Sequence, residues 1–183
     1  MRKQPEVTER TRAALRHAFW ELYRTTPIDK ISIRQITERA GYNRATFYLY
    51  YHDVYDLLAQ IEDKLIDDVR RVVEDRLLAS GELDFSAHMG FIAELASTGT
   101  EYFATLLGEG GDPAFVRRFK EVVAPLLERF LVPAQGLTSE QRALLLEFYL
   151  SGVIGMVARW LASEDPMPVD EFIGLIERGL LHR

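Results

Sequence analysis

The stretch that most constrains the fold is residues 33–51, which read IRQITERAGYNRATFYLYY. Its first half carries one stripe at helical spacing, made by Ile33, Ile36, Thr37 and Ala40. A recurrence every three or four residues predicts one buried face of an α-helix. Gly41 follows, and glycine adopts the left-handed backbone conformation that ends many helices. The pattern therefore predicts a helix over residues 33–40, a tight turn and a second short helix.

Polar residues stand where both helices should begin. Ser32 precedes the first helix and Asn43 precedes the second. Their side-chain oxygens can accept the unpaired N–H groups of a first helical turn. The second helix is predicted over residues 44–51, and its buried face holds Phe47 and Tyr51, which lie four residues apart.

The opposite face of this second helix is chemically different. It carries hydroxyl groups, one guanidinium and small side chains, from Arg44, Ala45, Thr46, Tyr48 and Tyr50. Such a face builds a poor core but suits phosphates and base edges. The alternative is that Tyr48 and Tyr50 are half-buried aromatics with solvated hydroxyls. Because Phe47 and Tyr51 already fill the inward face, we favour contact with DNA.

Charge is divided unevenly along the chain. Residues 1–52 contain 10 Lys and Arg against 5 Asp and Glu, a balance of +5, and residues 53–183 contain 12 against 23, a balance of −11, which together give the net charge of −6. A basic N-terminal segment followed by an acidic remainder is expected where only the N-terminal segment binds a polyanion. Chance variation in surface charge is the alternative. We predict a helix-turn-helix DNA-binding domain over residues 1–52 and a helical ligand-binding and dimerisation domain over residues 53–183.

Hydrophobic periodicity predicts an all-α chain of about nine helices. Besides the helix-turn-helix pair, we expect helices over residues 7–23, 53–78, 85–96, 102–107, 114–130, 139–162 and 169–180. The helix from Asp53 to about Leu78 is long enough to connect the DNA-binding segment to the rest of the chain. In front of the helix over residues 114–130, Asp112 should act as the cap, with Pro113 at the first helical position.

Several classes of protein are disfavoured. The chain has no cysteine, so disulfides and thiolate metal sites are excluded. His17, His52, His88 and His182 show no metal-ligand spacing. With no paired carboxylates or histidine-based dyad, we expect no enzyme, no metal and no cofactor. No run reaches the roughly 20 apolar residues of a membrane helix, and a signal peptide is absent, so we expect a cytoplasmic protein without a membrane partner.

The motifs of residues 31–58, ISIRQITERAGYNRATFYLYYHDVYDLL, resemble those of the TetR family of transcriptional regulators. The matching features, in family order, are Ala40-Gly41, Asn43, Arg44, Ala45, Thr46-Phe47-Tyr48, Tyr51 and Leu57-Leu58. The segments LLGEGGDPAFVRRF and FYLSGVIGMVARWL are similar to the regulatory C-terminal domain of one TetR subgroup. The resemblance implies a homodimeric repressor that binds double-stranded DNA at a palindromic operator and is released by an effector.

The resemblance also implies which residues contact DNA: Lys30, Arg34, Gln35, Asn43, Arg44, Ala45, Thr46, Tyr48, Tyr50 and His52. Two residues depart from the family pattern. Tyr42 replaces a small aliphatic residue, so its ring should lie at the surface of the turn. Val54 replaces a lysine, so one phosphate contact should be missing, with His52 or Lys30 in its place.

The helix over residues 139–162 is apolar around nearly its whole circumference, which predicts burial on every side. We hypothesise that it and the last helix pair with their copies in a second subunit. The interface would use Leu150, Val153, Ile154, Val157, Leu161, Phe172 and Ile176. A core helix within a single chain is the alternative.

Aromatic residues of the second domain form a candidate pocket for a small apolar or aromatic effector. They are Phe91, Tyr102, Phe103, Phe115, Phe119, Phe130 and Trp160. Plain core packing is an equally open interpretation. Activation in place of repression, control by a protein partner, and a helical dimerisation module without DNA binding are the other functions left open.

Overall fold

The structure is a computed structural model that describes residues 5–79, 99, 101–108, 111–133 and 135–180. Regular secondary structure in these residues is entirely helical, which confirms the all-α prediction. The labelled α-helices and a helical stretch at residues 101–107 make eight, close to the predicted nine. The helix expected over residues 85–96 lies outside the described residues. The chain divides into two compact units, Met1–Lys64 and Leu65–Arg183, each described by itself below.

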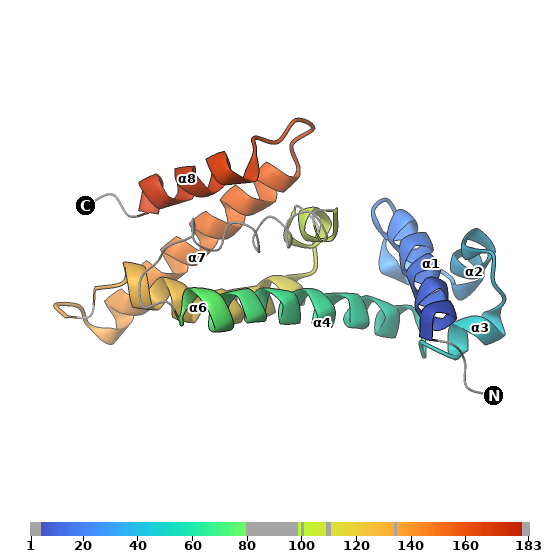
Figure 1. The fold of residues 1–183 in the computed structure, drawn as a ribbon. Helices are drawn as coiled ribbons and strands as arrows, with labels where there is room; N and C mark the ends of the chain where they lie inside the picture. Colours follow the sequence, from blue (N-terminus) through green and yellow to red (C-terminus); the bar gives the residue numbers. More distant parts are fainter. Residues whose placement is uncertain (1–4, 80–98, 100, 109–110, 134, 181–183) are drawn as a thin grey trace. The chain divides into compact units, whose positions relative to one another are not determined.

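The N-terminal unit is built from helices that enclose a small apolar core, and Figure 1 shows how these helices are arranged. In order they are α1 (Pro5–Tyr23), the 3-10 turn η1 (Ile28–Lys30), α2 (Ile33–Ala40), α3 (Arg44–Tyr48) and the first turns of α4 (Val54–Val72). The core holds Leu15, Phe19, Trp20, Ile36, Phe47 and Leu57, each at most 1% exposed. α1 is helical from Pro5, the first described residue and two residues before the predicted start, and it ends at Tyr23 as predicted.

The division between the units falls inside α4, at Lys64 and Leu65. The predicted domain boundary, between residues 52 and 53, coincides instead with the start of that helix. α4 continues into η2 (Val73–Leu77), a π-helical turn, so the helical backbone reaches almost to the predicted end near Leu78. Arg129 donates a hydrogen bond to the Leu78 carbonyl at 2.7 Å and satisfies an acceptor that the helix end leaves free.

The C-terminal unit adds α6 (Pro113–Leu131), α7 (Ser139–Leu161) and α8 (Val169–Leu180). The predicted cap of α6 is confirmed, because the Asp112 carboxylate accepts from the Ala114 N–H at 2.7 Å. α7 and α8 run antiparallel, side by side (Figure 1). Their shared core consists of Phe172, Ile173 and Ile176, with Met156, Val157, Trp160 and Val169 packed against it.

α7 differs from its expected burial. Only Leu150 and Ile154 are buried, whereas Leu144 is 67% exposed and Phe148 is 69% exposed. Among the described residues, α7 is also the one helix long and apolar enough to cross a membrane, by length and composition only, and soluble core helices pass that test too. A single chain therefore leaves one apolar face of α7 in solvent, and burial on every side is not achieved within it.

Candidate nucleic-acid interface

The turn between α2 and α3 is fixed by backbone geometry at Gly41. Gly41 has φ 74° and ψ 28°, in the left-handed region. Its N–H donates to the Glu38 carbonyl at 3.4 Å, and the Tyr42 N–H donates to the Thr37 carbonyl at 2.9 Å. This pair of hydrogen bonds is the Schellman arrangement, which satisfies the last carbonyls of a helix. The predicted stop at Gly41 is confirmed.

The start of α2 is a reciprocal capping box. The Ser32 hydroxyl accepts from the Gln35 N–H at 3.3 Å, and the Gln35 side-chain oxygen accepts from the Ser32 N–H at 2.8 Å. The predicted Ser32 cap is therefore confirmed, with Gln35 as a partner that the prediction did not include. Gln35, a predicted DNA contact, thus has its side-chain oxygen occupied.

Asn43 caps α3 in the same way, because its side-chain oxygen accepts from the Thr46 N–H at 2.9 Å. The Thr46 hydroxyl lies 3.2 Å from the same oxygen. α3 ends at Tyr48, so the prediction of a helix to Tyr51 is too long. The N–H groups of Tyr50 and Tyr51 both bond to the Phe47 carbonyl at 3.0 Å, and this tightened turn ends the helix.

α3 separates a buried face from an exposed one. Phe47 is fully buried, Tyr51 is 2% exposed, and their rings are 5.4 Å apart, which confirms the predicted inward face. Arg44, Ala45 and Tyr48 are exposed and Thr46 is half-buried. Among the described residues, Arg44 has no acidic partner. The side chains assigned to base contact therefore lie outside the core.

Tyr50 is less accessible than Tyr48. Its ring is half-buried beneath the Arg12 guanidinium of α1, whose carbon lies 5.6 Å from the ring centroid. The neighbouring Tyr51 ring is buried, and burial raises the pKa of the Tyr51 hydroxyl. Arg16 of α1 forms an ion pair with Glu9 at 2.6 Å. The end of α3 is thus covered by the basic side of α1, which holds Tyr50 in place.

The remaining cationic candidates lie at the surface of α2 and η1. Lys30 is exposed, with its ammonium 3.7 Å from the Asp29 carboxylate. Arg34 is exposed and its Nε donates to Glu38 at 2.7 Å, and this hydrogen bond raises the pKa of Arg34. Both groups lie in solvent, where a phosphate can compete for them.

His52 is exposed and its backbone is fixed by the start of α4. Its N–H donates to the Asp56 carboxylate at 2.7 Å, which lowers the pKa of Asp56. The Asp56 N–H donates to the Asp53 side chain at 2.8 Å, so Asp53 caps the first turn of α4. Val54, which stands at the family's lysine position, is 8% exposed and faces inward.

Two exposed side chains border these residues. Tyr42 is 37% exposed at the turn, as the sequence predicts. Leu49 is 61% exposed at the end of α3, and the prediction omitted it. The signal that could have found it is its place between Tyr48 and Tyr50, outside the Phe47–Tyr51 face.

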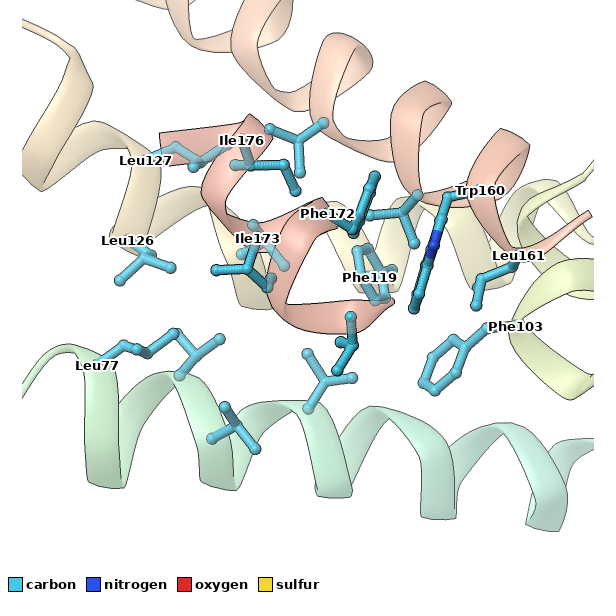
Figure 2. A pocket seen from close by; sticks show the side chains of 17 residues that line it. Leu77, Phe103, Phe119, Leu126, Leu127, Trp160, Leu161, Phe172, Ile173 and Ile176 are labelled. Carbon is cyan, nitrogen blue, oxygen red and sulfur yellow. The ribbon is translucent and has the colours of Figure 1, made fainter. Parts of the chain in front are cut away.

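The C-terminal unit contains a cavity of about 190 Å³ with an entirely apolar lining (Figure 2). Of the predicted effector contacts, Phe103, Phe119 and Trp160 line it. Phe115 packs on the rings of Phe103 and Phe119 at 6.1 and 6.4 Å. Tyr102 and Phe130 do not line the cavity, and Phe91 lies outside the described residues.

The residues predicted for a dimer interface lie largely against the chain's own interior. Five of them line the same cavity: Val153, Val157, Leu161, Phe172 and Ile176. The other two, Leu150 and Ile154, are 5% and 7% exposed. The predicted set therefore marks the inward face of α7 and α8 within one chain.

Comparison with known proteins agrees with this architecture. Residues 92–181 match a family model of the TetR type described as "Transcriptional regulator C-terminal region". The chain is similar to the crystal structure of a TetR transcriptional regulator from Streptococcus agalactiae 2603V, with TM-score 0.66, 22% identity and 96% coverage of both chains. It is also similar to a structure described as dihydroxyacetone kinase operon activator DhaS, with TM-score 0.56, 14% identity and coverage of 94% of this chain and 97% of that one. No curated protein sequence matches it.

The family match covers the C-terminal half, and the likeness of fold extends over nearly the whole chain. The capped α2–α3 pair supplies the helix-turn-helix that the resemblance implied. The chain belongs to the TetR family of DNA-binding transcriptional regulators.

Proposed function

We propose that this regulator is a homodimeric repressor that binds a palindromic operator through α3 and leaves it when an effector binds in the C-terminal unit. One observation carries the proposal. Phe47 is fully buried while Tyr48 is 59% exposed, on a helix capped by Asn43. This arrangement presents the polar face of α3 to a major groove without any cost to the core.

Contacts to DNA divide into two kinds. Arg44, Thr46 and Tyr48 would read base edges, and Ala45 and the exposed Leu49 suit thymine methyl groups. Contacts that fix the position on the backbone would come from Lys30, Arg34, Gln35, Asn43, Tyr50 and His52. An acidic chain binds DNA in this scheme because the positive charge is concentrated in residues 1–52, the proposed DNA-binding domain.

Dimerisation would use the solvent face of α7. Leu144 and Phe148 are 67% and 69% exposed, and on the same face Gly152 and Gly155 follow at helical spacing. A Cβ added at either glycine meets no atom within 4 Å, so a second backbone could approach closely there. Apolar patches of this kind mark interaction sites. This face replaces the inward residues first predicted for the interface.

A two-fold dimer gives the short α3 enough selectivity. One five-residue helix contacts few base pairs, whereas two copies read half-sites about 34 Å apart or a multiple of it. An effector that binds only to dimers with one particular spacing between the two DNA-binding domains shifts the population away from the DNA-bound form. A hundredfold change in occupancy needs about 2.7 kcal/mol of differential affinity. The protein would act in the cytoplasm, on chromosomal DNA.

Activation is the second candidate, because one similar structure is described as an operon activator. A promoter that carries the selected operator, fused to a reporter gene, distinguishes the two. Repression predicts higher expression in cells without the protein. Lower expression in those cells would identify an activator.

The proposal is tested by selection of bound sequences from random duplex DNA with the full chain. We expect an inverted repeat to be enriched, with affinity that falls steeply as salt rises. The double variant Arg44→Ala/Tyr48→Ala, selected in parallel, should enrich no repeat. Failure of the wild-type chain to bind any duplex at low salt would contradict the proposal and favour a dimerisation module.

A further inference from the structure

Each long helix that the structure describes in the C-terminal unit contributes side chains to the cavity. Its lining includes Val69 of α4, Leu77 of η2, Val123 of α6, Val157 of α7 and Ile176 of α8. All the lining residues belong to the unit Leu65–Arg183. A molecule in the cavity would therefore contact α4, η2, α6, α7 and α8 at once.

The lining residues that the structure describes offer no hydrogen bond to a guest. Apart from Trp160, the described lining side chains are all valine, leucine, isoleucine or phenylalanine. The Trp160 indole N–H already donates to the Met167 carbonyl at 2.8 Å. A hydroxyl, amide or charged group held against this lining would lose bonds to water and gain none from the side chains. The cavity therefore selects against polar molecules.

The aromatic residues of the lining gather toward one end of the cavity, together with Leu161 (Figure 2). Trp160 and Phe103 lie toward one end, with Phe119 and Phe172 next to them, and Leu77, Leu126 and Leu127 lie toward the other. Trp160 and Phe172 stack at 4.5 Å with an interplanar angle of 5°, and Phe103 meets Phe119 edge-on at 6.1 Å. A ring suits the first end, because aromatic pairs gain from stacked and edge-to-face contact. A flexible alkyl chain suits the second.

The size of the cavity limits the guest. Its volume is about 190 Å³. An apolar cavity of about 150 Å³ lined by leucine, isoleucine and phenylalanine stays dry and binds benzene. The space here therefore admits one benzene-sized ring together with a short alkyl chain.

We propose that the cavity binds a neutral alkylbenzene-like hydrocarbon, with its ring beside Trp160 and Phe103 and its alkyl chain toward Leu126 and Leu127. The inference rests on the proposed function only where it makes this ligand the effector. Binding itself is a property of the free protein and does not depend on an operator.

An isosteric series tests the chemistry on the full chain without DNA. The probes are n-butylbenzene, 3-phenylpropan-1-ol and 3-phenylpropylammonium, which carry a methyl, a hydroxyl and an ammonium group at the same place. By titration calorimetry we expect n-butylbenzene to bind, the alcohol to bind at least about tenfold more weakly, and the ammonium ion not to bind. Equal binding of the alcohol or the ammonium ion, or no binding of n-butylbenzene, would overturn the inference.

A matched pair of substitutions on α6 tests the location. Val123→Phe fills the cavity, whereas Glu121→Phe adds the same ring to the exposed face of the helix. We expect Val123→Phe to weaken n-butylbenzene binding at least about tenfold and Glu121→Phe to leave it unchanged. If Val123→Phe does not fold, Val123→Thr replaces it, because its hydroxyl makes the lining polar at nearly constant volume. Unchanged affinity in the folded variant would place the ligand elsewhere and refute the inference.

A separate measurement distinguishes this inference from the proposed function. n-Butylbenzene is added to the complex of the protein with its selected operator, and DNA release is followed by anisotropy. Binding to the free protein without release of DNA supports the ligand assignment and contradicts the effector mechanism. Absence of binding refutes the ligand assignment, whatever the protein does on DNA.

Discussion

The rings of Phe47 and Tyr48 meet edge to face, with centroids 5.9 Å apart and planes at 89°. Phe47 is fully buried and Tyr48 is 59% exposed. The buried ring therefore supports the exposed one, and a change at Tyr48 alters the surface of α3 while the core stays in place.

Removing the side chain of Arg44 or Tyr48 should weaken binding to the operator without unfolding the protein. We expect Arg44→Ala and Tyr48→Ala each to weaken operator binding by about 1–3 kcal/mol, the typical range for a lost base contact. Arg39→Ala is the control, because Arg39 is exposed on α2 and pairs with Glu21 at 3.6 Å. Fluorescence anisotropy on the selected operator measures the effect. Unchanged affinity in both variants would show that α3 does not read DNA.

Gly41 should tolerate asparagine better than alanine. Its φ of 74° strains an L-residue, although a Cβ would meet no atom within 4 Å. We expect Gly41→Ala to lower the free energy of unfolding by about 1 kcal/mol. Gly41→Asn should cost less, because asparagine enters the left-handed region more readily. Urea unfolding followed by circular dichroism measures the free energy of unfolding of both variants. Equal losses would mean that backbone strain at position 41 does not determine their stability.

Phe148 should be required for association of two chains. We expect Phe148→Glu to convert the dimer into monomer, because it buries a charge in an apolar contact. Tyr55→Glu is the matched control, since Tyr55 is an aromatic residue 55% exposed on α4 and outside the proposed interface. Sedimentation velocity at micromolar concentration measures the outcome. A Phe148→Glu dimer, or a wild-type monomer, would rule out this face of α7.

The ion pair between α6 and α7 should make stability depend on pH. Glu147 accepts hydrogen bonds from Lys120 and from the Ser151 hydroxyl, which lower the pKa of Glu147. A lowered folded-state pKa stabilises the fold above the ordinary carboxyl pKa, and this contribution is lost as pH falls through the lowered value. Since the Glu147 side chain is 57% exposed, the ion pair stabilises the fold by at most about 1 kcal/mol.

Glu147→Gln should therefore lower the free energy of unfolding at neutral pH. In acid, the difference between this variant and the wild type should disappear. The measurement is urea unfolding of both proteins at pH 7 and at pH 3. Lys120→Met should have a similar effect at pH 7, and the double variant should be little worse than either single one. A pH-independent difference between wild type and Glu147→Gln would contradict the role given to the carboxylate.

The helix-turn-helix could be predicted because local interactions determine it. Ser32, Gly41 and Asn43 each act on backbone groups within a few residues, so sequence spacing alone places the ends of α2 and the start of α3. The end of α3 was less predictable. The chain leaves the helix after Tyr48 although Tyr50 and Tyr51 continue the helical pattern, and Tyr50 packs under Arg12, far away in sequence.

The faces of α7 could not be predicted, because its apolar residues cover nearly the whole circumference. Sequence periodicity finds a buried face by contrast with a polar one, and α7 provides almost no contrast. Phe148 and Val157 look equivalent in sequence, yet one is 69% exposed and the other packs against the α8 core. The cavity also depends on long-range packing, so only part of its predicted aromatic lining is found there.

The capping box at the start of α2 restricts what Gln35 can recognise. Its side-chain oxygen already accepts from the Ser32 N–H and hydroxyl, both at 2.8 Å. Glutamine reads adenine by accepting from the N6 amino group while donating to N7. With its oxygen occupied, Gln35 keeps only its amino group for DNA, so it suits bare acceptors such as a guanine O6 or a phosphate. Reading an adenine would require α2 to give up its own first turn.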